Sequence, residues 1–181
     1  SEAELRAEDI ELAADHVAFT AKTAHEQAQV RLAIPGGFTV YNALAAVTAA
    51  LLLKIPPETI QAQISGFQNT GMRQNIYKMG DVTVIEDCYN ASPSSMSASL
   101  SVLSMIAQRE GGRSIAVLGD MRELGDFSRA LHEEVGAKVA EYHIDKLYTF
   151  GGDAAFIGHG AKKAGMDEQA VHSCRDLEDV K

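Results

Sequence analysis

Two short apolar runs, residues 82–85 and 113–118, stand out in the middle of the chain. Near-continuous apolar runs of this length are typical of strands that are covered on both faces, as in parallel sheets. Between the runs, Ser92 is a candidate helix cap, apolar residues recur at helical spacing over 96–107, and Gly111 ends the pattern. The pattern predicts two parallel strands joined by a helix in a right-handed crossover.

Similar patterns extend in both directions along the chain. After the central unit we expect a helix, a strand, a helix, a strand and the start of another helix, at 127–135, 146–150, 154–164, 170–173 and 176–178. Before it we expect the two strands of a hairpin and then two helices, at 17–20, 30–34, 40–54 and 56–67. Thr39 is the expected cap of the first of these helices, which is apolar almost all round and therefore predicted to be buried. The chain is thus predicted to be α/β, with a mostly parallel sheet beyond a linker at 68–71.

Composition narrows the classes of partner. The 181 residues carry a formal net charge of −9, which disfavours binding to nucleic acid or to an anionic membrane surface. The most apolar segment, 43–53, is too short to span a bilayer, so no membrane insertion is expected. The two cysteines, Cys88 and Cys174, form no metal-ligand pattern and fit a reducing cytoplasm.

Polar residues follow both central strands. Asp87, Tyr89 and Asn90 come after the first strand, and Asp120 and Glu123 come after the second. Ligands of open α/β sheets bind beyond the carboxyl ends of the strands, so these residues are candidates for a site. The plainer interpretation is turn chemistry for the first group and solvated acids at a helix start for the second. As a functional pair, the two acids could serve as catalytic carboxylates or as magnesium ligands.

The remaining candidates are weaker. Arg73 follows the linker and could clamp a phosphate, or it could be an ordinary surface arginine. The six histidines show no metal-ligand spacing, and Cys88 has no obvious activating partner. Neither GxGxxG nor GxxxxGK[ST] occurs in the chain, so it has no dinucleotide fingerprint and no P-loop.

Several segments together resemble motifs of the Mur ligase family: PGGFTVYNALAA at 35–46, TGMR at 70–73, EDCYNASPSSM at 86–96 and AVLGDMRELG at 116–125. The last two are similar to motifs of the members that add D-alanyl-D-alanine. Members that add a diamino acid carry a DYAH-type stretch instead, and this chain has no histidine there. The chain departs from the family pattern at Phe38 and Thr39, which replace a His-Asn pair and leave Asn42, and at Cys88 and Ser92.

The resemblance implies a domain arrangement. Residues 1–71 would be the C-terminal, α+β part of a P-loop-type ATPase central domain. Residues 72–181 would be a Rossmann-like C-terminal domain, truncated at its end. We therefore expect a fragment, with the P-loop, a catalytic lysine and a UDP-sugar domain preceding Ser1.

The resemblance also implies an activity. With ATP and Mg²⁺, the intact enzyme would convert the carboxylate of UDP-N-acetylmuramoyl-tripeptide into an acyl phosphate. The amine of D-alanyl-D-alanine would then attack it to form an amide, a step of peptidoglycan precursor synthesis. We expect a cytoplasmic monomer for this reaction.

Site residues carry over by position. Asn42 would face the adenine, Asp87 the ribose hydroxyls, and Tyr89 and Asn90 would line the nucleotide, while Arg73 would reach its ribose–phosphate part. Asp120 and Glu123 would face the cleft in which the dipeptide meets the acyl phosphate, as the candidate catalytic residues. Two other possibilities remain open: a non-catalytic α/β module that binds a nucleotide or a protein, and a sister amide ligase with another amino substrate.

Overall fold

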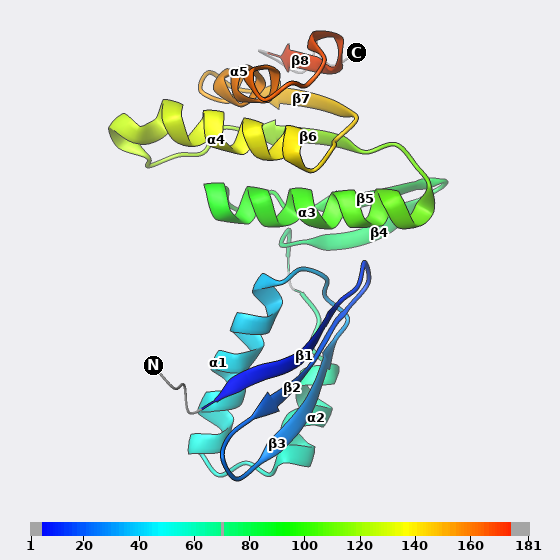
Figure 1. Cartoon of the computed structure of the whole chain (residues 1–181), viewed down its shortest axis with the longest axis vertical. Helices are drawn as coiled ribbons and strands as arrows, with labels where there is room; N and C mark the ends of the chain where they lie inside the picture. The colour runs from blue at the N-terminus through cyan, green and yellow to red at the C-terminus, as the bar shows by residue number, and fades with distance from the viewer. Residues whose placement is uncertain (1–4, 70, 175–181) are drawn as a thin grey trace. The chain divides into compact units, whose positions relative to one another are not determined.

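The computed structural model describes residues 5–69 and 71–174. It consists of two compact units, residues 1–70 and 71–181 (Figure 1). Position 70 of the expected linker and the expected helix start at 176–178 lie outside the described residues.

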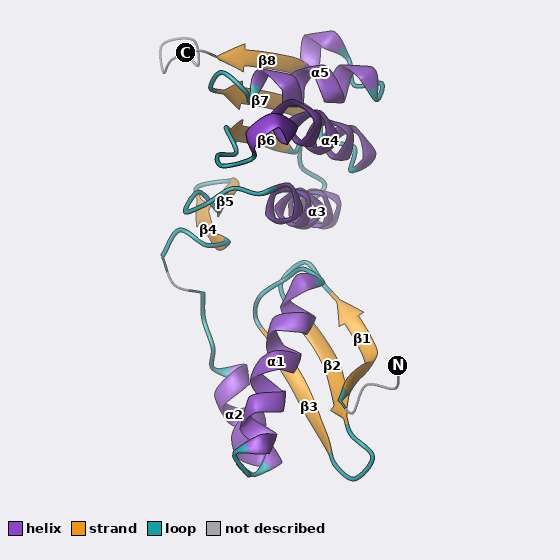
Figure 2. Cartoon of the chain, turned by 90° about the vertical axis from the view of Figure 1, so that its left-hand side faces the viewer, coloured by secondary structure: helices purple, strands orange, loops and turns teal. Residues whose placement is uncertain are grey.

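The first unit is a three-stranded antiparallel sheet with two helices on one face (Figure 2). Its elements are β1 Arg6–Leu12, β2 Val17–Lys22, β3 Gln27–Leu32, α1 Phe38–Leu52 and α2 Pro57–Ser65. The predicted hairpin is confirmed, because β2 pairs with β3 from Val17↔Leu32 to Lys22↔Gln27. β1 was not predicted as a strand; most of its residues are exposed, so its sequence lacks a clear apolar alternation.

Two expectations for the helices of this unit are wrong. Thr39 does not cap α1: the helix begins at Phe38, and the Thr39 hydroxyl donates to the Pro35 carbonyl. Nor is α1 buried all round, since Tyr41 is 76% exposed and Leu52 80% exposed. Packing on the sheet covers a single face of a helix, so apolar composition alone overstates burial. The second helix ends at Ser65, before the exposed Phe67 that was assigned to it.

The second unit alternates strands and helices along the chain. Its elements are β4 Asn75–Met79, β5 Val82–Glu86, α3 Pro93–Glu110, β6 Ile115–Gly119, the 3-10 turn η1 Gly125–Phe127, α4 Ser128–Glu141, β7 Lys146–Phe150, α5 Ala155–Lys163, the 3-10 turn η2 Glu168–Ala170 and β8 Val171–Cys174. β6, β7 and β8 form a parallel sheet, and α4 and α5 cover one of its faces (Figure 2). The predicted α/β class and the strand and helix assignments at 146–150, 154–164 and 170–173 are confirmed.

The two central strands, predicted to be parallel strands of one crossover unit, lie in different sheets. β5 pairs with β4 in an antiparallel hairpin, and among the described strands β6 is hydrogen-bonded to β7 alone. The chain reverses at Gly80, whose φ of 61° is readily adopted by glycine, so β5 finds a partner next to it in the sequence. The intervening helix α3 is as predicted. Ser92 and Ser95 form a reciprocal capping box at its start, and Gly111 ends it in a left-handed conformation.

The i, i+4 spacing of Phe127, Leu131 and Val135 predicts that these three residues face the core, but only Val135 of the three is buried in α4. Phe127 is exposed, whereas His132, Val135, Gly136 and Val139 are buried. A Cβ atom on Gly136 would lie only 2.6 Å from the Ala161 nitrogen of α5. Glycine at this position therefore allows the backbones of α4 and α5 to pack in direct contact above the sheet.

Candidate functional site

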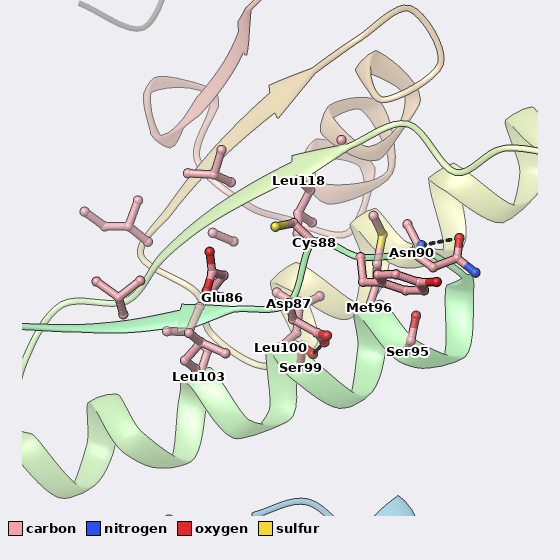
Figure 3. Close-up of a pocket in the computed structure, with 18 of the residues that line it drawn as sticks. Glu86, Asp87, Cys88, Asn90, Ser95, Met96, Ser99, Leu100, Leu103 and Leu118 are labelled. Carbon is pink, nitrogen blue, oxygen red and sulfur yellow. Dashed lines mark hydrogen bonds between the residues drawn. The ribbon is translucent and has the colours of Figure 1, made fainter. Parts of the chain in front are cut away.

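A cavity of about 940 Å³ lies between β5, α3 and β6 (Figure 3). Apolar residues of all three elements form much of its wall, among them Val84, Leu100 and Val117. Polar residues line the part that follows the two strands. Asp87, Tyr89, Asn90 and Asp120 contribute to it; Arg73, Glu123 and Asn42 are not among its lining residues.

The carboxylate of Asp87 is held by the protein itself. Its Oδ1 accepts a hydrogen bond from the Gln74 backbone N–H at 3.0 Å, and its Oδ2 accepts one from the Ser99 hydroxyl. Figure 3 shows Asp87 and Ser99 facing each other. Asp87 therefore joins the residue before β4 to the middle of α3, and it is half-buried. An ionised carboxylate has about four acceptor positions, so further donors can still bind it.

Arg73 and Tyr89 lie together. The Arg73 guanidinium lies 4.3 Å from the centre of the Tyr89 ring, and the Tyr89 N–H donates to the Met72 carbonyl at 3.2 Å. The Tyr89 side chain is 62% exposed, so it can offer an aromatic surface to a ligand. Next to it, the exposed Asn90 accepts a hydrogen bond from the Ala91 N–H, which is the plainer, turn-forming role.

Asp120 and Glu123 have different surroundings. The Asp120 carboxylate accepts a hydrogen bond from the Ala154 N–H at 2.6 Å, at the start of α5. This places a negative charge where the helix dipole favours one. Glu123 is exposed and has a φ of +62°, and the described contacts include no hydrogen bond between the two acids. Among the described residues, no three acidic, histidine or cysteine side chains gather as metal ligands.

The sequence analysis did not identify one polar residue, His132, which lies beside the loop that follows β6 and carries Asp120 and Glu123. His132 on α4 is completely buried, and its Nε2 accepts a hydrogen bond from the Met121 N–H at 3.0 Å. The available signal was its spacing: His132 lies three and seven positions before Val135 and Val139, on the face of α4 that is buried.

The remaining candidate, Asn42, belongs to the first unit. It lies on α1, where it is exposed.

In the described part of the chain, no helix is long and apolar enough to cross a membrane.

Comparison with known proteins places the second unit in a family. The sequence profile described as "Mur ligase, glutamate ligase domain" matches residues 72–180. The UDP-N-acetylmuramoyl-tripeptide–D-alanyl-D-alanine ligase of Bacillus subtilis (strain 168) is 39% identical over 141 residues, which are 77% of this chain and 30% of that protein. The chain therefore spans less than a third of the length of this relative.

Solved structures agree with the sequence comparison. A crystal structure of MurF from Acinetobacter baumannii superimposes with a TM-score of 0.82 at 30% identity, covering 94% of this chain and 35% of that one. The MurF ligase of Thermotoga maritima in complex with ADP superimposes with a TM-score of 0.76 at 22% identity, covering 98% and 38% of the two chains. The latter likeness concerns the fold alone.

Proposed function

Because this chain belongs to the Mur ligase family, whose members are ATP-dependent amide ligases, we propose that it is part of a ligase that adds D-alanyl-D-alanine to UDP-N-acetylmuramoyl-tripeptide. The observation that carries the proposal is the 39% identity to a ligase of that name over 77% of the chain. The absence of a histidine after Tyr89 supports this amino substrate over a diamino acid. We place the reaction in the cytoplasm and the enzyme in a monomeric state.

The proposed reaction has two steps. The tripeptide carboxylate takes the γ-phosphoryl group of ATP, which gives an acyl phosphate and ADP. The amine of D-alanyl-D-alanine then attacks the acyl carbon, the amide bond forms, and inorganic phosphate leaves. Phosphoryl transfer depends chiefly on positioning and on neutralising charge, so the residues of this chain act by holding the reactants.

The nucleotide contacts are assigned by the resemblance of this chain to the family, residue by residue. Asn42 contacts the adenine, while Arg73, Tyr89 and Asn90 border the nucleotide at the end of β5. The arginine–tyrosine pair supports this assignment, because it offers a cation and an exposed aromatic face at the same place. The Asp87 carboxylate accepts hydrogen bonds from the ribose hydroxyls. It uses the acceptor positions that remain beside its hydrogen bonds from Gln74 and Ser99.

The reacting dipeptide is assigned to the loop after β6. Asp120 and Glu123 are the proposed catalytic residues, and their negative charge suits an incoming ammonium group that must lose a proton before it attacks. Its hydrogen bond to Ala154 holds the Asp120 carboxylate in one orientation. A carboxylate held in this way is organised before the substrate arrives.

Phosphate release tests the proposal. We expect the full-length protein to release phosphate from ATP in the presence of UDP-N-acetylmuramoyl-tripeptide and D-alanyl-D-alanine, and not when the dipeptide is replaced by a diamino acid. Release that depends on the diamino acid would identify a sister ligase. Binding of ATP without release under any of these conditions would identify a non-catalytic nucleotide-binding module.

The 181-residue chain by itself should release no phosphate. It contains no P-loop to hold the β- and γ-phosphates. An exposed ion pair such as Arg73 with one phosphate contributes about 1 kcal/mol at most. Enzymatic acceleration requires about 8 kcal/mol or more. Dipeptide-dependent phosphate release by the chain alone would contradict the assignment of the γ-phosphate site to a P-loop elsewhere.

A further inference from the structure

His132 has a hydrogen bond at each ring nitrogen although it is completely buried. Nε2 lies 3.0 Å from the Met121 backbone nitrogen, and Nδ1 lies 2.7 Å from the Ser128 carbonyl oxygen. A backbone N–H can only donate and a carbonyl can only accept. The ring must therefore be neutral, with its proton on Nδ1 and a bare Nε2.

The ring also belongs to a longer connection. The Ser128 hydroxyl lies 3.3 Å from Nδ1 and donates to the Asp153 carboxylate at 2.7 Å. Asp153 directly precedes Ala154, whose N–H donates to Asp120. The loop after β6 is thus held at two adjacent residues, Asp120 by the start of α5 and Met121 by His132.

Resting on the proposed function, we propose that His132 is a positioning residue of the ligase, which fixes the loop that carries Asp120 and Glu123. It acts through the backbone of Met121, whose side chain is only 2% exposed, and it does not touch the reactants. Without the acceptor at Nε2, the buried Met121 N–H must move to find another partner. Such a movement displaces the neighbouring carboxylate.

Loss of the His132 acceptor should disturb the loop after β6 and leave the residues assigned to the nucleotide in place. A displacement of about 1 Å at a reacting group can cost about 100-fold in rate. Asp87 is held separately by Gln74 and Ser99, and Tyr89 by Met72. Loss of the histidine acceptor should therefore lower kcat and leave the KM for ATP within about twofold of its original value.

Three substitutions separate positioning from packing. His132→Gln places an amide oxygen near the position of Nε2 and retains an acceptor for Met121. His132→Asn is shorter, reaches only the region of Nδ1, and loses that acceptor. His132→Phe fills the space without any polar group. We expect kcat of the full-length ligase to fall by about 10- to 100-fold for the Asn and Phe variants and to be largely restored in the Gln variant.

Val139→Ala is the matched control. Val139 lies on the same face of α4 and is equally buried, but its side chain belongs to the apolar core. We expect this variant to be less stable and to keep kcat per folded molecule. Equal kcat in the Gln and Phe variants, or a loss in Val139→Ala as large as that in His132→Phe, would overturn the proposal.

A second measurement does not depend on ligase activity. In ¹⁵N NMR spectra of this chain, the His132 ring should show a protonated Nδ1 and a bare Nε2. The Asn substitution should shift the amide signals of Met121 and Glu123 and leave those of Tyr89 and Asn90 in place, while the Gln substitution should shift them less. A proton on Nε2, or unchanged loop signals in His132→Asn, would refute the positioning role. Inactive full-length protein together with the expected spectra would refute the proposed function alone.

Discussion

Replacement of Gly151 by alanine should disturb Asp120 directly. Gly151 follows β7 with a φ of +124°, a conformation that residues with a side chain rarely adopt. A Cβ atom there would lie 2.5 Å from Oδ2 of Asp120 and closer still to the rest of the carboxyl group. The Asp120 side chain must then turn away and give up its hydrogen bond to the Ala154 N–H.

The two costs can be estimated separately. Backbone strain of this kind costs about 1–3 kcal/mol. A hydrogen bond to a charged acceptor contributes about 1.5 kcal/mol at the low end of its range, which suits the exposed Asp120. We therefore expect Gly151→Ala to lower the free energy of unfolding by about 3 kcal/mol. In the proposed full-length ligase, the same substitution should also lower kcat.

The neighbouring glycine provides the control. A Cβ on Gly152 would have no atom within 4 Å, and its φ lies outside the left-handed region. Gly152→Ala should therefore change stability by no more than about 0.5 kcal/mol. Urea unfolding followed by circular dichroism measures both variants.

A double-mutant cycle isolates the clash from the strain. In an Asp120→Ala background, Gly151→Ala should cost only the strain, so the two substitutions should couple by about 1–2 kcal/mol. Equal effects of Gly151→Ala and Gly152→Ala would refute the reasoning. Additive effects of the substitutions at 120 and 151 on the free energy of unfolding would show that the Asp120 carboxylate does not clash with the new methyl group.

Three further results are expected. In the proposed full-length ligase, Asp87→Ala should raise the KM for ATP more than it lowers kcat, since the proposed ribose contact would act alike in ground and transition states. A large loss of kcat with unchanged ATP dependence would make Asp87 catalytic. Gly136→Ala should destabilise the protein by about 1–3 kcal/mol, because the new methyl group meets the backbone of α5. Gly158→Ala should destabilise it less, because the nearest neighbour of a Cβ there is a side-chain methyl of Val171, at 3.1 Å. Equal destabilisation by the two alanine substitutions in urea unfolding would contradict this. The N–H and hydroxyl of Ser114 both donate to Asp145 and lower its pKa from the ordinary value. The ionised Asp145 carboxylate therefore stabilises the fold at neutral pH, and this contribution is lost as the pH falls below about 4. Asp145→Asn should destabilise the protein at pH 7 and have no effect in acid. An equal effect at both pH values would contradict this linkage.

Local signals explain why many elements could be predicted from the sequence. The expected strand at 146–150 coincides with β7, and Ser92 and Gly111 bound α3 as expected. In each case, the deciding interactions join residues only a few positions apart: a capping hydroxyl with the next turn, or an apolar run with the glycine that ends it. Such interactions can be recognised without knowledge of the rest of the chain.

Part of the candidate site was also visible in the sequence. Because ligand-binding residues of open α/β sheets follow the strands, the positions of Asp87, Tyr89, Asn90 and Asp120 pointed to one edge, and all four line the cavity. Their individual contacts were not visible. The pairing of Arg73 with Tyr89 and the burial of His132 depend on where the chain returns after a turn or a crossover.

The sequence by itself thus determined the order of strands and helices from β5 to β8, both ends of α3, and the set of polar residues beyond β5 and β6; β4 was not predicted. Only the tertiary structure decided that β6 pairs with β7, which face of α4 is buried, and which partners hold each polar side chain. The physical reason is separation along the chain. Asp120 meets Ala154 across 34 positions and Asp87 meets Ser99 across 12. The same helices and strands could pack against one another in several ways. Contacts between residues that are distant in the sequence form only in the one packing that the whole chain adopts.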